Sequence, residues 1–101
     1  MRRRYLAVRV ESEASVNREE LTDAVWRAVT QLFGEYGASQ VGLVVIEYDE
    51  QNGRGVVRCS HKAVPMVKAS IASITKIDGK SAAIRVLGVS GTLKALHKRY
   101  G

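Results

Sequence analysis

The chain has 101 residues and carries 16 Lys+Arg against 10 Asp+Glu, a formal net charge of +6. This length suits one domain, residues 1–101, with a short basic N-terminal arm at 1–4. No apolar run approaches the roughly 20 residues that span a bilayer, and Arg9 and Glu11 interrupt the only stretch that could follow a basic leader. The single cysteine, Cys59, excludes an intrachain disulfide. We therefore expect a cytoplasmic protein with no membrane partner.

Charge is divided unevenly between the two halves of the chain. Residues 1–50 hold 6 Lys+Arg and 9 Asp+Glu (6 − 9 = −3), whereas residues 51–101 hold 10 Lys+Arg and one acid, Asp78 (10 − 1 = +9). A strongly basic half suits a polyanion, because each cation that neutralises a phosphate releases a condensed counterion. A solvated surface that only maintains solubility is the alternative, and we favour a nucleic-acid partner.

The first half of the chain predicts a strand followed by a helix. Residues 5–11 alternate between apolar and polar, which indicates a strand with one face in a core. Asn17 and Glu20 have the spacing of a capping box, and Gly37 is suited to end the helix that follows. The apolar stripe of this helix comprises Leu21, Ala24, Val25, Ala28, Val29, Leu32, Phe33 and Tyr36.

The remaining elements alternate in the same way. Residues 41–48 predict a strand, 49–53 a hairpin loop and 55–60 the returning strand. A second helix is expected over 62–75 with Pro65 in its first turn, followed by a turn at 78–80, a strand over 82–89 and a short basic helix over 93–100. The order β-α-β-β-α-β-α predicts an α+β, ferredoxin-like sheet of the RNA-recognition-domain type with an added C-terminal helix. Both long helices should cover one face, and the first and third strands should be central.

The chain does not show the residues that catalysis or metal binding needs. One cysteine and two histidines, His61 and His97, are too few to form a metal site. Ser60 and His61 are not expected to act as a nucleophile and its base, because neighbouring residues on a strand point to opposite faces. We expect no catalytic residues and no cofactor bound by the protein itself. The segment 88–94 joins a strand to a helix, and it can be an ordinary Ser/Thr helix cap, a phosphate site or both.

Two surfaces are candidates for partner binding. If Arg9, Arg58 and Arg85 share the open sheet face, they should contact phosphates and not read bases, unless they pair with acids such as Glu11 and Glu47. Apolar side chains outside the expected core predict a protein interface that comprises Trp26, Val44, Ile46 and Tyr48.

Several segments in order resemble one known family. They are Arg4-Tyr5-Leu6-Ala7, Ala24-Val25-Trp26, Gly55-Val56-Val57-Arg58-Cys59, Asp78-Gly79-Lys80 and Leu87-Gly88-Val89-Ser90-Gly91-Thr92-Leu93-Lys94. Together they are similar to the archaeal ribonuclease P protein component 2 family, which is related to a eukaryotic ribonuclease P and MRP subunit. The resemblance runs from Arg4 to about Tyr100.

This resemblance implies a non-catalytic subunit of a ribonucleoprotein endonuclease, a hydrolase that removes 5′ leaders from precursor tRNA. The RNA would be the catalyst and would carry magnesium, precursor tRNA would be met indirectly, and ribonuclease P protein component 3 would be the protein partner. A homodimer within a two-plus-two assembly is a further expectation. The residues expected to contact RNA phosphates are Arg2, Arg3, Arg4, Arg54, Arg58, Lys62, Arg85, Ser90, Gly91, Thr92, Lys94, Lys98 and Arg99.

Two other functional hypotheses stay open at this point. The chain can be a protein-interaction module of ferredoxin-like fold that serves as an assembly subunit without touching RNA. It can also be a small metabolite-binding or acylphosphatase-like enzyme, although no residue that would position a water is evident. A fold alone justifies none of these functions.

Overall fold

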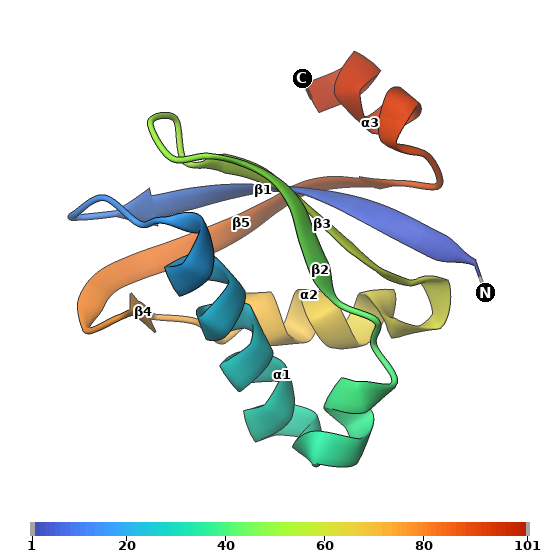
Figure 1. Ribbon diagram of the computed structural model, residues 1–101, viewed down its shortest axis with the longest axis horizontal. Coiled ribbons are helices and arrows are strands. Elements are labelled where there is room, and N and C mark those ends of the chain that lie inside the picture. Colours follow the sequence, from blue (N-terminus) through green and yellow to red (C-terminus); the bar gives the residue numbers. More distant parts are fainter. Residues whose placement is uncertain (1, 101) are drawn as a thin grey trace.

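The structure is a computed structural model that describes residues 2–100. In chain order the elements are β1 (Arg3–Ser12), α1 (Arg18–Ser39), β2 (Val44–Asp49), β3 (Arg54–Ser60), a 3-10 turn (His61–Ala63), α2 (Val64–Ala72), β4 (Lys76–Ile77), β5 (Lys80–Ser90) and α3 (Leu93–Tyr100) (Figure 1). Within this described part of the chain, no helix is both long and apolar enough to cross a bilayer.

The sheet has the order β2-β3-β1-β5-β4, and every neighbouring pair is antiparallel. The predicted α+β, ferredoxin-like order is therefore confirmed, with β1 and β3 inside the sheet. β4 is an addition that the sequence did not indicate, because a two-residue strand is too short to show alternation. Asp78 and Gly79 both have positive φ, 50° and 77°, as a tight hairpin turn between β4 and β5 requires.

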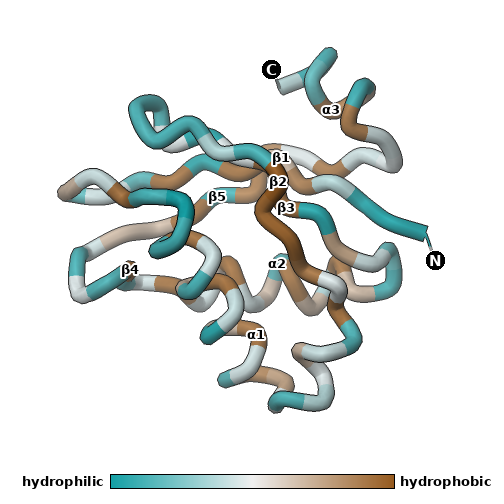
Figure 2. Tube along the Cα trace, viewed as in Figure 1, coloured by the Kyte–Doolittle hydropathy of each residue, from teal (hydrophilic) through white to brown (hydrophobic). Residues whose placement is uncertain are grey.

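Helices cover both faces of the sheet. α1 and α2 lie together on one face and α3 lies on the other (Figure 1). The main core forms between the sheet and the two long helices, around residues such as Leu6, Val8, Leu21 and Ile71. A second, smaller cluster of Ala7, Val56 and Leu96 forms beneath α3. Brown, apolar stretches run along the middle of the sheet, whereas the start of β1 is hydrophilic (Figure 2).

The start of α1 confirms the predicted capping box. The Asn17 side chain accepts from the Glu20 N–H at 2.8 Å, and the Glu20 carboxylate accepts from the Asn17 N–H at 2.9 Å. Lys80 adds an ion pair to Glu20 at 3.1 Å. The hydrogen bond from the Asn17 backbone, with contributions from Asp78 and Lys80, lowers the pKa of Glu20 to about 2.

The end of α1 was predicted wrongly. The helix does not stop at Gly37: it breaks at Gly34, which has φ 77° and ψ 171°, and a last turn continues to a C-cap at Gln40. Leu32 and Phe33 just before the break and Tyr36 after it were predicted on the apolar stripe, but they are 50%, 40% and 80% exposed.

Other differences are smaller. β1 already includes Arg3 and Arg4, so these residues pair with β3 and do not form the expected free arm, while Met1 lies outside the described residues. β2 begins at Val44 and not at residue 41. α2 runs only over Val64–Ala72, because the chain must leave the helix early to form β4.

Candidate nucleic-acid interface

Basic residues from separate elements meet at the end of the sheet where β1 begins. Arg3 pairs with Ser60 at the end of β3, and the N–H of His61 donates to the carbonyl oxygen of Arg2 at 2.9 Å. Lys62 follows directly in the 3-10 turn and is exposed. The start of β1 also pairs with the end of β5, where Tyr5 is opposite Ser90, so the first turn of α3 begins at the same end of the sheet. We call the basic residues at this end the strand-end cluster: Arg2, Arg3, Arg4, Lys62 and Lys94.

The predicted segment between β5 and α3 lies beside this cluster. Thr92 Oγ1 accepts from the N–H of Ala95 at 3.1 Å, and Ser90 Oγ accepts from the N–H of Thr92 at 3.4 Å. The predicted helix cap is therefore confirmed, and a phosphate site here stays a prediction. The Arg4 guanidinium nitrogen Nη1 would lie 3.6 Å from a Cβ placed on Gly91, so the loop and the cluster are continuous.

Three arginines lie side by side on the face that carries α3. Arg9 on β1 is directly opposite Arg54 on β3 and opposite Arg85 on β5. We call these three residues the arginine row. All three are exposed. The expectation that Arg9 and Arg85 share this face is confirmed, and the expected acidic partner is present for Arg85, whose Nη1 lies 3.3 Å from Glu11 Oε1.

Arg58 is on the same face but does not join the arginine row. Its partner across β1 is Tyr5, and the Ala7–Val56 pair, on which Leu96 packs, lies between the two positions. Arg58 is half-buried, and its Nε has no hydrogen-bond partner within residues 2–100. The side chain is thus held at the strand-end side of α3.

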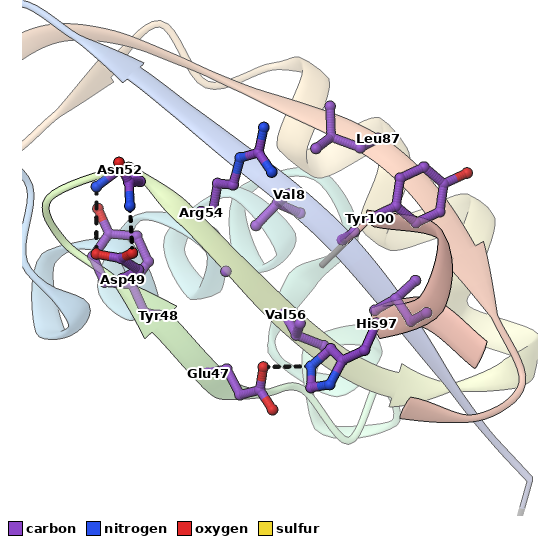
Figure 3. Close-up of a pocket in the computed structure, with 13 residues that line it drawn as sticks. Val8, Glu47, Tyr48, Asp49, Asn52, Arg54, Val56, Leu87, His97 and Tyr100 are labelled. Carbon is purple, nitrogen blue, oxygen red and sulfur yellow. Dashed lines mark hydrogen bonds and ion pairs between the residues drawn. The ribbon is translucent and has the colours of Figure 1, made fainter. Parts of the chain in front are cut away.

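A groove opens between the arginine row and the last turn of α3. Its volume is about 470 Å³, and it is lined by Ala7, Val8, Glu47, Tyr48, Asp49, Asn52, Arg54, Gly55, Val56, Leu87, Leu96, His97 and Tyr100. Figure 3 shows His97 reaching toward β2, where its Nε2 lies 2.7 Å from Glu47 Oε1, while Tyr100 lies near Leu87 on β5. The C-terminal turn of α3 therefore forms one wall of the groove. Sequence reasoning missed this site, because its lining comes from β1, β2, β3, β5 and α3, which are far apart in the sequence.

The remaining predicted residues have mixed positions. Lys98 and Arg99 are exposed on α3. Of the predicted protein interface, Trp26 and Tyr48 pack partly against the main core and Ile46 partly against the cluster beneath α3, while Val44 is 39% exposed. A regular strand would place Ile46 and Tyr48 on the same face, but a bulge in β2 between Val45 and Glu47 turns them to opposite faces. The interface role of these four residues stays a prediction.

Cys59 and the acidic residues show no arrangement for metal binding in the described part of the chain. No three His, Cys, Asp or Glu side chains converge there. Burial of Cys59 in the sheet raises the pKa of its thiol to about 11, so it packs as a neutral side chain.

The layer order and the basic surfaces define a class: a small α+β domain with the sheet of an RNA-recognition domain and an extra helix on its open face. A model of the Rpp14/Pop5 family matches residues 4–101. The chain belongs to this family. The resemblance found from the sequence motifs is thereby confirmed.

Individual relatives agree with this assignment. The chain is 36% identical over 99 residues to a protein of Pyrococcus furiosus named ribonuclease P protein component 2, covering 98% of this chain and 82% of the relative. A protein of the same name from Methanosarcina mazei is 35% identical, covering 98% of this chain and 84% of the relative. The fold is similar to a chain in the cryo-EM structure of yeast ribonuclease MRP, with a TM-score of 0.75 at 13% identity over 97% of this chain and 90% of that chain.

Proposed function

We propose that the chain acts as a non-catalytic protein subunit of ribonuclease P, which binds and stabilises the catalytic RNA for removal of the 5′ leader from precursor tRNA. Membership of the Rpp14/Pop5 family and relatives named as ribonuclease P components support this function. The single structural observation that carries the mode of action is the strand-end cluster, which gathers cations from β1, the 3-10 turn and α3 at one end of the sheet.

The physical role of such a surface is to neutralise phosphates where RNA helices crowd together. Each arginine or lysine that pairs with a phosphate releases a counterion and lowers the repulsion between RNA segments. The RNA should then need less magnesium to reach its active fold. Magnesium would be held by the RNA, and the protein would contribute phosphate contacts that do not depend on base sequence.

Reconstitution of cleavage with ribonuclease P RNA and its protein subunits tests this proposal. Wild-type chain should restore precursor tRNA cleavage at low magnesium, and an Arg3→Ala/Lys94→Ala variant, which removes two exposed residues of the strand-end cluster, should need more magnesium. Arg27→Ala/Lys68→Ala is the matched control, because it removes the same charge from exposed positions of α1 and α2. Equal rescue by the two double variants would overturn the assignment of the strand-end cluster as an RNA contact.

A protein-interaction module remains the second candidate, and one observation favours it. Leu32, Phe33 and Tyr36 at the broken end of α1 are exposed and close in sequence, and in this second function they contact ribonuclease P protein component 3. A gel shift of the isolated chain with structured RNA over a salt series separates the two functions. A steep loss of affinity with salt supports direct RNA binding, whereas no binding supports the interaction module.

A further inference from the structure

The arginine row is unfavourable for the stability of the sheet. Arg54, Arg9 and Arg85 are direct neighbours across three adjacent strands, and strands in an antiparallel pair lie only about 5 Å apart. Like charges directly opposite each other destabilise a sheet. Packing gives no compensation, because all three side chains are exposed.

Nearby acids neutralise only one end of the row. Glu11 pairs with Arg85, and both partners are largely exposed. Asp49 is opposite Arg54 across β2 and β3, but its carboxylate accepts from the Asn52 side chain at 2.7 Å. Within residues 2–100, Arg9 and Arg54 have no carboxylate oxygen within 4.0 Å of their guanidinium nitrogens. The row therefore presents two uncompensated cations to a ligand.

The groove lies directly beside these two cations. Arg54 lines it, and Tyr100 stands on the opposite wall with its ring over Gly88, where a Cβ would lie 2.2 Å from the ring (Figure 3). Ala7, Val56 and Leu96 give the groove an apolar floor. A volume of about 470 Å³ falls within the range of roughly 300–1,000 Å³ that is typical of sites for small organic groups.

We propose that the arginine row and the groove together bind an unpaired RNA segment, with successive phosphates on Arg54 and Arg9 and a nucleobase in the groove against Tyr100. An unpaired strand fits because its bases can turn away from the backbone and stack on an aromatic ring. The bases of a duplex are paired and stacked inside the helix, so none of them can enter the groove. A duplex would therefore contact the arginine row only through its phosphate backbone. This inference rests on the proposed function and adds the form of RNA that this face takes.

The test uses the full chain and fluorescence anisotropy with a labelled 12-nucleotide oligouridine and a labelled 12-base-pair RNA duplex. Arg9→Gln/Arg54→Gln should weaken binding of the single strand more than binding of the duplex, because the duplex can also use the strand-end cluster. Each phosphate contact to a single strand contributes a salt slope of about −0.7, so Arg9→Gln/Arg54→Gln should make the slope about 1.4 less negative. The control Arg27→Gln/Lys68→Gln removes the same charge from the opposite, helical layer and should change the slope much less.

A second variant tests the base site separately from charge. Tyr100→Leu should weaken single-strand binding roughly 5- to 100-fold, as loss of one stacked base does, without changing the salt slope. Tyr36→Leu is the matched control, because Tyr36 is 80% exposed on α1. Thermal melts of all variants show whether the sheet remains folded.

The outcomes separate this inference from the proposed function. If Arg9→Gln/Arg54→Gln weakens binding of the duplex as much as binding of the single strand, or if the two double variants behave alike, the inference is overturned even when the chain still supports precursor tRNA cleavage. If wild type binds neither RNA and does not support cleavage in reconstitution, both the inference and the proposed function fail.

Discussion

Removal of the Leu96 side chain should detach α3 without unfolding the rest of the domain. Leu96 is 1% exposed and is the one buried residue of α3 within the described chain. Leu96→Ala removes three carbon groups at about 0.8 kcal/mol each, or about 2.4 kcal/mol of burial. Since 1.4 kcal/mol is tenfold, the docking equilibrium of α3 should fall roughly 50-fold. If α3 stayed docked, the cavity left by Leu96 would cost as much free energy or more. We therefore expect α3 to detach from the sheet.

Native-state amide hydrogen exchange measures this effect residue by residue. Amides in the last turn of α3 should exchange about 50-fold faster in Leu96→Ala, while those of β1 and β3 keep most of their protection. Leu32→Ala is the control, because it makes the same change at a side chain that is 50% exposed on α1. An equal loss of protection in α3, β1 and β3, together with a loss of about 2–5 kcal/mol in the free energy of global unfolding, would refute the reasoning, because α3 would then be an inseparable part of the core.

Three further predictions concern single positions. Gly88→Ala should displace the Tyr100 ring and shift its NMR signals, because a Cβ at position 88 would lie 2.2 Å from the ring. In a Tyr100→Ala background the same change should lower the free energy of unfolding only slightly. Glu20 has a pKa of about 2 in the folded protein against its ordinary 4.5, so the folded state binds a proton at this carboxylate less readily than the unfolded state. The stabilisation that ionised Glu20 provides is therefore complete above pH 4.5 and is lost as the pH falls toward 2. Urea denaturation of Glu20→Gln should therefore show a flatter decline over that range, whereas Glu19→Gln should follow wild type. Arg9→Gln should raise the free energy of unfolding by about 0.2–1 kcal/mol, measured by thermal melting, and an unchanged or lower stability would contradict the unfavourable arginine row.

Most of the fold could be predicted because its signals are local. The alternation of apolar and polar residues along β1, the capping box at Asn17 and the basic composition of α3 each depend on residues close in sequence. The end of α1 could not be predicted this way. Gly34 and Gly37 are both suited to stop a helix, and the local sequence does not distinguish them.

The candidate site was predicted only in part, for a related reason. The sequence marked all five residues of the strand-end cluster as candidates, but it could not show that Arg2, Arg3 and Arg4 from the first half lie at the same end of the sheet as Lys62 and Lys94. The arginine row depends on register: Arg9 meets Arg54 and Arg85 only because three strands pair in one alignment. The bulge at Val45 and Glu47 is equally invisible in a single sequence, yet it decides which face Ile46 and Tyr48 occupy.

The place of β1 in the sheet has a consequence for how the chain acquires its structure. β1 lies between β3 and β5, and the pairing of Val8 with Val86 joins positions 86 − 8 = 78 residues apart. A growing chain therefore carries its first strand with one bare edge until almost the whole polypeptide has left the ribosome. Closing so distant a pair is slow compared with forming local hairpins. The domain should complete its sheet only after synthesis of β5, and any truncation before that strand should leave a product prone to aggregation.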